Sequence, residues 1–323
     1  MQTISKPQKM GYFKQQIKNF KKNKAIIFFI IPAILLTFLF GYVPMTGIIF
    51  AFKKSIDSGN WFYDVLTQPF TGTHVLKFFS DVRVVTALKN TLIISGIKIL
   101  IFFPLTIILA IFLSEIRKPS LSKLILIVLC LPNFLSWPVV IGIWNNLLNL
   151  EKGLINNIIS ALGGERIDFY AYSESGGISA FKVLAVFLSI WKGLGWGSIF
   201  FYSAIMSIDK EYYEAATIDG ATKIQKVWYL TIPGILPVIA LQLVMNITYI
   251  LDAGFDLIYS MYTLNPDAEN YEYILGTYIF DLARGNSNLP FAVAMSVVNG
   301  LFALVLMLVG NWFVKKKLGS SLW

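Results

Sequence analysis

The sequence predicts an all-α integral membrane protein with six transmembrane helices. Hydrophobic residues make up 56% of the 323 residues, charged residues only 14%, and the mean hydropathy is +0.66. This composition is typical of a chain whose solvent is largely lipid. The apolar residues also gather in six runs, each long enough for the ~20 residues that a spanning helix needs. These runs cover about residues 25–52, 91–113, 124–148, 181–206, 234–258 and 289–314.

The chain divides into a basic N-terminal segment, residues 1–24, and a six-helix transmembrane domain, residues 25–323. The first apolar run exceeds the ~7–15 residues of a signal-peptide core, and no small-residue cleavage site follows it, so we interpret it as an uncleaved helix. Lys and Arg are more frequent in the N-terminal segment, the C-terminal tail and every second loop than in the other loops. The positive-inside rule therefore predicts that both termini and the loop at about 207–233 are cytoplasmic.

Composition also excludes several classes of function. The net charge of +9 comes largely from basic clusters beside apolar runs, where they contact lipid head groups, so no nucleic-acid partner is expected. Cys130 and His74 are the only cysteine and histidine. No disulfide, metal site or catalytic triad is expected from them. No G-x-x-x-x-G-K-[ST] string is present, so the chain is not expected to bind a nucleotide in that way.

The third apolar run contains two helix-breaking pairs, Pro132-Asn133 and Trp137-Pro138. Irregular backbone at membrane depth is tolerated only where protein or a water-filled cavity surrounds it, so these pairs predict an interrupted helix that faces the bundle interior. Residues 53–89 mix aromatic and polar side chains and predict a folded excursion on the membrane surface. The polar loop at 149–180 contains a possible short amphipathic helix at 154–162.

Residues 207–233 predict two short helices joined by a tight bend. Ser207 or Asp209 can cap the first helix, and acidic residues in its first turn suit the positive end of the helix dipole. Gly220 accepts the left-handed conformation that ends a helix, and a second helix can run from Thr222 until Pro233. Ala215 and Ala216 would form a smooth patch beside the aromatic Tyr212 and Tyr213. This loop is therefore predicted to be a docking surface.

The order Glu214-Ala215-Ala216, then Gly220 after three residues, then Ile232-Pro233, resembles the EAA loop of the permease subunits of binding-protein-dependent ABC importers. In that family the loop sits in a cleft of the cytoplasmic ATPase and transmits its movement. The resemblance implies that the ATPase-coupling residues here are Tyr212, Tyr213, Glu214, Ala215, Ala216, Asp219, Gly220 and Pro233.

The rest of the chain also resembles this family, most closely its carbohydrate-type polysaccharide-permease branch. The matching stretches include YVPM at 42–45, SEIR at 114–117, LPNFLSW at 131–137 and IWK at 190–192. The resemblance implies the type I importer fold and a bacterial cytoplasmic membrane protein that imports an oligosaccharide or related sugar. It also implies a second permease in a heterodimer, two ATPase subunits that bind ATP and Mg, and an extracellular substrate-binding protein. The chain itself would be no enzyme and hold no cofactor.

Four charged residues stand out within the apolar runs: Lys98, Lys192, Asp252 and Asp256. A charge near the bilayer centre costs ~2.5–3.5 kcal/mol on insertion scales, so each needs a reason. We expect Lys98 to extend along its apolar stem toward an interface. Lys192 stands in a glycine-rich stretch and can face the bundle interior.

The fifth run carries a polar stripe at helical spacing, which predicts one face of a continuous helix. Its members are Gln242, Asn246, Tyr249, Asp252 and Asp256. Such a stripe either bonds neighbouring helices or lines a hydrophilic passage. With Trp191, whose ring suits the apolar face of a sugar, these residues form the expected substrate path. The alternative function is an ion- or proton-coupled secondary transporter that uses Asp252 and Asp256.

Overall fold

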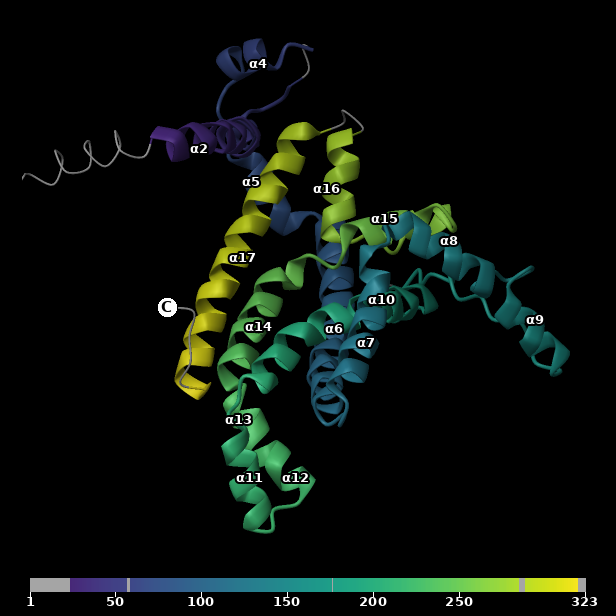
Figure 1. Ribbon diagram of the computed structural model, residues 1–323. Coiled ribbons are helices and arrows are strands. Elements are labelled where there is room, and N and C mark those ends of the chain that lie inside the picture. Colours follow the sequence, from purple (N-terminus) through teal and green to yellow (C-terminus); the bar gives the residue numbers. More distant parts are fainter. Residues whose placement is uncertain (1–23, 57–58, 176, 285–287, 319–323) are drawn as a thin grey trace, which may run out of the picture.

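The computed structural model describes residues 24–56, 59–175, 177–284 and 288–318. Every named element in these ranges is helical, and the β-contact recorded among them is an isolated bridge between Lys53 and Phe70. Four helical segments are long and apolar enough to cross a membrane, and two bent helix pairs raise the number to as many as six. Figure 1 shows a central group of long helices, with shorter helices that project from it. The predicted all-α membrane class is confirmed.

The first span consists of four helical segments that follow one another without a gap in the sequence. They are α2 (Lys24–Thr37), the π-helical η1 (Phe38–Tyr42), α3 (Val43–Met45) and the 3₁₀-helical η2 (Thr46–Phe52). The changes of helix type surround Pro44, which has no N–H to donate to the preceding turn. The η2 end packs against α17 (Leu289–Leu318), while the most apolar part of this span has no buried residue.

Helix α10 (Ala180–Met206) is the central element, and it packs against α6 (Val82–Ser114) and α7 (Pro119–Cys130). The approach to α7 is so close that a Cβ on Gly195 would lie 2.3 Å from the backbone of Leu129. A glycine is therefore required at this position for the two helices to touch. Buried apolar clusters form around both ends of α10, one with Phe181 and Leu188 and another with Phe201.

The third span is broken as the sequence predicts. Helix α7 passes into the 3₁₀ turn η3 (Leu131–Phe134), and α8 (Trp137–Leu148) then leaves at a bend of 101°. Lys192 Nζ of α10 donates a hydrogen bond to the carbonyl of Asn133 at the break, at 2.9 Å. Lys192 thus faces the bundle interior and satisfies a carbonyl that the interrupted helix leaves free.

The fifth span differs from the prediction at both ends. It begins in the loop with α12 (Lys223–Lys226), η4 (Val227–Thr231) and α13 (Ile232–Gly234), bends by 65°, and continues as α14 (Leu236–Thr248) and η5 (Tyr249–Leu251). The prediction of a continuous helix as far as Ile258 is wrong. Gly254 has φ +94°, and its N–H donates to the Asp252 carboxylate at 3.1 Å. This left-handed turn ends the span, and α15 (Phe255–Tyr262) starts anew.

The segments at the N-terminal end of α10 form a folded layer, which we call the far layer: residues 149–175, 177–179 and 263–284. Its helices are α9 (Leu154–Ala161), η6 (Pro266–Asn270) and α16 (Leu275–Arg284). The excursion predicted at 53–89 is likewise folded, with α4 (Trp61–Thr67) and α5 (Thr73–Ser80). The short helix predicted at 154–162 is confirmed by α9. Asn90 Nδ2 of α6 donates to the carbonyls of Tyr271 and Tyr273, which ties α6 to the far layer.

A buried ion pair holds the far layer to α10. Lys182 Nζ lies 2.7 Å from Glu272 Oε2, and both side chains are fully buried. The same ammonium donates to the Gly177 carbonyl, and Glu272 Oε1 accepts the Ser173 N–H. Sequence reasoning missed this pair, because its members are far apart in the chain and neither stands in a motif. Nearby, burial and then the Asp168 carboxylate raise the pKa of Tyr170 to about 12, so this phenol stays protonated.

Candidate functional site

The loop at 207–233 has the predicted helix, bend and helix. Asp209 caps α11 (Lys210–Ile218) by accepting the Glu211 N–H at 3.1 Å. Gly220 has φ +77°, and the N–H of Ala221 donates back to the Ala216 carbonyl at 2.9 Å. These contacts make the glycine-terminated helix end that the sequence predicts. Thr222 and Gln225 then form a reciprocal capping box at the start of α12.

Side-chain hydrogen bonds brace the two loop helices against each other. Lys226 Nζ donates to the Thr217 hydroxyl at 2.6 Å, which joins α12 to α11. The hydroxyls of Tyr213 and Thr231 lie 2.9 Å apart, which joins α11 to η4. The loop is therefore a small rigid unit, and Tyr213 is part of its internal bracing.

The remaining coupling residues lie on the surface of this unit. Tyr212 is 64% exposed, Glu214, Ala215 and Asp219 are exposed, and Ala216 is half-buried. Ile218 at the tip is 88% exposed. Exposed apolar side chains beside small residues are typical of a surface that a partner covers. Of the two tyrosines expected to be anchors, Tyr212 points outward, whereas Tyr213 is half-buried.

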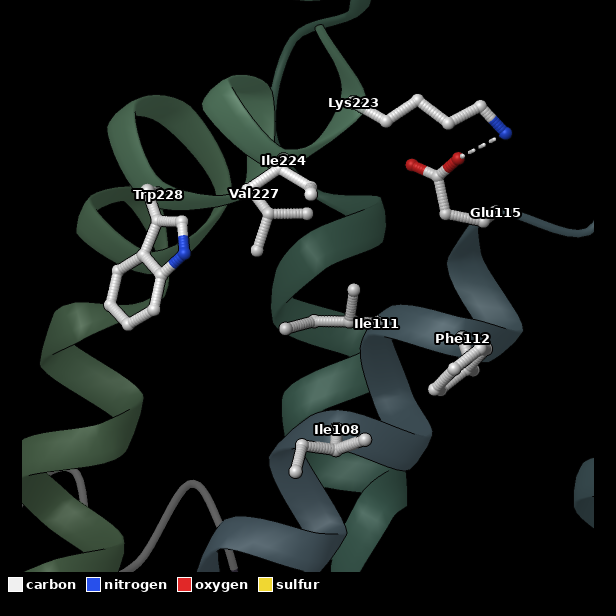
Figure 2. Close-up of a pocket in the computed structure, with 8 residues that line it drawn as sticks. All are labelled: Ile108, Ile111, Phe112, Glu115, Lys223, Ile224, Val227 and Trp228. Atoms are coloured by element: carbon white, nitrogen blue, oxygen red, sulfur yellow. Dashed lines mark ion pairs between the residues drawn. The ribbon is translucent and has the colours of Figure 1, made fainter.

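An ion pair joins the loop to the end of α6. Lys223 Nζ of α12 lies 3.4 Å from Glu115 Oε2, and the two side chains are 83% and 45% exposed. Figure 2 shows these groups facing each other across the mouth of an apolar groove of about 440 Å³. The groove is lined by Ile108, Ile111, Phe112, Glu115, Lys223, Ile224, Val227 and Trp228. The loop thus meets the bundle across a hollow, bridged by an exposed charge pair.

A second cavity, of about 220 Å³, lies between α6, α10 and α14 within the membrane-spanning bundle. Its walls combine aromatic rings with a small set of polar groups, among them Gln242 and Asn246. The full lining is Phe102, Phe103, Thr106, Gly193, Trp196, Gly197, Phe200, Phe201, Gln242 and Asn246. Asn246 Nδ2 donates a hydrogen bond to the carbonyl of Gln242, which lies in the same helix. Aromatic faces and amides of this kind suit sugar rings and hydroxyls.

The structure separates the other members of the expected substrate path. Tyr249 is 60% exposed and lies near the end of the span, beyond the cavity lining. Asp252 is exposed in the turn after η5, and Asp256 is exposed on α15. Trp191 packs edge-on against Trp144, with ring centroids 5.5 Å apart. Of the predicted stripe, Gln242 and Asn246 line the cavity. The other members lie beyond the end of α14, in η5, in the turn after it and in α15.

Within the part of the chain that the structure describes, no group of three or more His, Cys, Asp or Glu side chains is arranged to hold a metal ion. Residues 1–23 of the predicted N-terminal segment lie outside the described residues.

Comparison with known proteins identifies the family. The sequence model described as "Binding-protein-dependent transport system inner membrane component" matches residues 103–316, and the chain belongs to this family. The polygalacturonan/rhamnogalacturonan transport system permease protein YteP of Bacillus subtilis (strain 168) is 31% identical over 296 residues, covering 91% of this chain and 89% of that protein. Protein LplB of the same strain is also 31% identical, over 92% of this chain and 90% of LplB.

A solved structure agrees with this assignment. A chain of a bacterial ABC transporter involved in the import of the acidic polysaccharide alginate aligns with a TM-score of 0.81 and 30% identity, over 94% of this chain and 99% of that chain. The predicted fold of an ABC importer permease is confirmed.

Proposed function

We propose that this protein is the permease subunit of an ABC importer that moves an oligosaccharide or related sugar across the bacterial cytoplasmic membrane. The names of its relatives support the sugar: polygalacturonan and rhamnogalacturonan for YteP, and alginate for the transporter of known structure. The cavity of aromatic rings and amides between α6, α10 and α14 supports the same class of substrate. ATP hydrolysis in separate ATPase subunits, which bind ATP and Mg, would drive the movement.

One observation carries the coupling mechanism: the second helix of the loop is the beginning of the fifth span. The chain runs from α12 through η4 and α13 into α14, and α14 contributes Gln242 and Asn246 to the cavity wall. Because α11 is hydrogen-bonded to α12 and η4, a push on α11 displaces the base of α14. An ATPase that grips the loop can thereby open and close the cavity in alternation.

The complete importer would contain a second permease, two ATPase subunits at the α11 end, and an extracellular binding protein at the far layer. Both termini and the loop would be cytoplasmic, with lipid around the spans. The crystal structure of a bacterial alginate ABC transporter in complex with an alginate pentasaccharide-bound periplasmic protein supports the last of these partners. The alternative is an ion- or proton-coupled secondary transporter that uses Asp252 and Asp256. It has less support, because the two carboxylates are exposed and lie on separate elements.

Purification with co-expressed candidate subunits and reconstitution into liposomes tests this function. The intact complex should hydrolyse ATP faster when the loaded binding protein is added, and should take up the matching oligosaccharide. The Glu214→Lys variant should lose ATPase subunit in a detergent pull-down while keeping its thermal stability, since Glu214 is exposed. Uptake that follows an ion gradient without any ATPase subunit would contradict the proposal.

A further inference from the structure

Lys98 stands at the middle of α6, on the face of the helix that turns inward. Buried residues recur along α6 at spacings of three and four on both sides of it; they include Thr91, Ile94, Ser95, Thr106, Ala110 and Leu113. Residues at such spacings lie above one another on one face. Lys98 therefore belongs to the face that packs in the bundle. The expectation that its ammonium extends along its apolar stem toward a membrane interface stays a prediction.

The ammonium of Lys98 has no close partner, in contrast to those of Lys192 and Lys182. Among the described residues, none forms a hydrogen bond with it or an ion pair within 4.0 Å. Lys192 by contrast donates to the Asn133 carbonyl, and Lys182 pairs with Glu272. One turn away, the buried Ser95 hydroxyl also lacks a hydrogen-bond partner. Unsatisfied polar groups at membrane depth are costly and mark functional sites.

Lys98 lies one helical turn from the lining of the aromatic cavity and is not itself part of that lining. Phe102, one turn further along α6, lines that cavity, and η5, the continuation of the cavity helix α14, packs against α6. The charge of Asp252, just after η5, acts on the Lys98 ammonium across more than ion-pair distance. One Asp252 oxygen is already engaged by the Gly254 N–H. The region thus offers aromatic faces, amide groups and one cation whose counter-charge is remote.

We propose that Lys98 is a specificity-determining residue that binds a carboxylate of the transported sugar, so that the substrate is an oligosaccharide of uronic acids rather than a neutral one. This inference rests on the proposed function. A hydrogen bond between an ammonium and a carboxylate is among the stronger ones in proteins, and it strengthens where water is excluded. Asp252 competes for the same ammonium, which keeps the carboxylate from binding too tightly to be released.

The test uses the assembled importer with its binding protein in liposomes, and a carboxylated oligosaccharide, an oligogalacturonide of fixed length, as the probe. Lys98→Met should lower its uptake, measured as kcat/KM, by about tenfold or more. Lys98→Arg should retain most of the kcat/KM that Lys98→Met loses. Asp252→Asn should lower KM because it removes the competing charge. Lys316→Met, a change to an exposed lysine at the end of α17, is the matched control and should leave uptake unchanged.

Chemical rescue separates a charge effect from a structural one. Lys98→Cys in a Cys130→Ala background should be as defective as Lys98→Met. Modification of this cysteine with 2-aminoethyl methanethiosulfonate adds an ammonium group on a side chain of nearly lysine length and should restore uptake. Modification with methyl methanethiosulfonate, which adds no charge, should not. Two results would refute the role of Lys98 and leave the proposed function standing. They are equal activity of both adducts, and uptake by Lys98→Met equal to that of the unmodified importer. Failure of the unmodified importer to take up any oligosaccharide with ATP overturns the proposed function, and this inference with it.

Discussion

A lysine–glutamate pair lies near each end of α10, and the two pairs differ in kind: one joins α10 to the far layer, and the other joins the loop to α6. At the far layer, Lys182 and Glu272 are 2.7 Å apart and fully buried, with further hydrogen bonds to the backbone. At the loop, Lys223 and Glu115 are 3.4 Å apart and largely exposed, beside an open groove. A buried pair cannot be opened without leaving a charge out of water, whereas an exposed pair is exchanged for water at little cost. The far layer is therefore built to stay fixed, and the loop is built to move.

Breaking the buried pair should produce the largest effect on stability. Lys182→Met leaves Glu272 buried without its partner, so the free energy of unfolding should fall by about 3–5 kcal/mol. Thermal unfolding in detergent measures this as a lower Tm or a loss of folded protein. The double variant Lys182→Met/Glu272→Leu removes both charges and should recover much of the loss. If the single variant is as stable as the parent, the far layer is not held by this pair.

A change at the bend of the loop should affect transport more than stability. Gly220 has φ +77°, and a Cβ added there would meet no atom within 4 Å, so a substitution acts through the backbone alone. Gly220→Val should strain the bend by about 1–3 kcal/mol and reduce ATP-driven uptake while membrane insertion is retained. Gly220→Asn, which tolerates the left-handed conformation, is the control. Full uptake and full substrate-stimulated ATPase activity in the valine variant would refute the geometry.

Substitutions along the fifth span should separate residues that lie on either side of its break. Asn246→Leu removes an amide from the cavity and should lower uptake several-fold with little change in Tm, since its recorded hydrogen bond stays within its own helix. A lost bond in lipid costs only ~0.6 kcal/mol on average. Asp256 is exposed on α15 and lies outside the cavity lining, so Asp256→Asn should leave uptake unchanged. A larger loss of uptake in Asp256→Asn than in Asn246→Leu would contradict this separation and support the single polar face that the sequence predicts.

Removing the exposed pair should have the smallest effect on stability. Lys223→Met should change the free energy of unfolding by less than about 1 kcal/mol, and the change should shrink further at high salt. Comparison with Lys182→Met under the same conditions tests the contrast between the two ends. Destabilisation of similar size by both variants would show that the loop is as firmly held as the far layer.

The sequence predicts the loop better than it predicts the membrane site, and the reason is the range of the interactions. Asp209 and Gly220 determine the ends of α11 through contacts two to five residues away, so the helix could be located almost to the residue. The predicted fifth span extends too far because Gly254 stands within an apolar run of the sequence. The pair Asp252 and Gly254 was the available signal for a turn. Nothing local marks Glu272 as the partner of Lys182, because that contact depends on the assembled fold.

The most direct test of the coupling mechanism measures whether the loop controls the cavity wall. The variant Asn246→Cys is made in an importer that also carries Cys130→Ala. It is labelled with a water-soluble thiol reagent in the nucleotide-free and ATP-locked states. The account predicts labelling rates that differ between the two states, protection by the transported sugar, and loss of the difference when Gly220→Val is added. Equal rates in both states, or a difference that survives Gly220→Val undiminished, would contradict it.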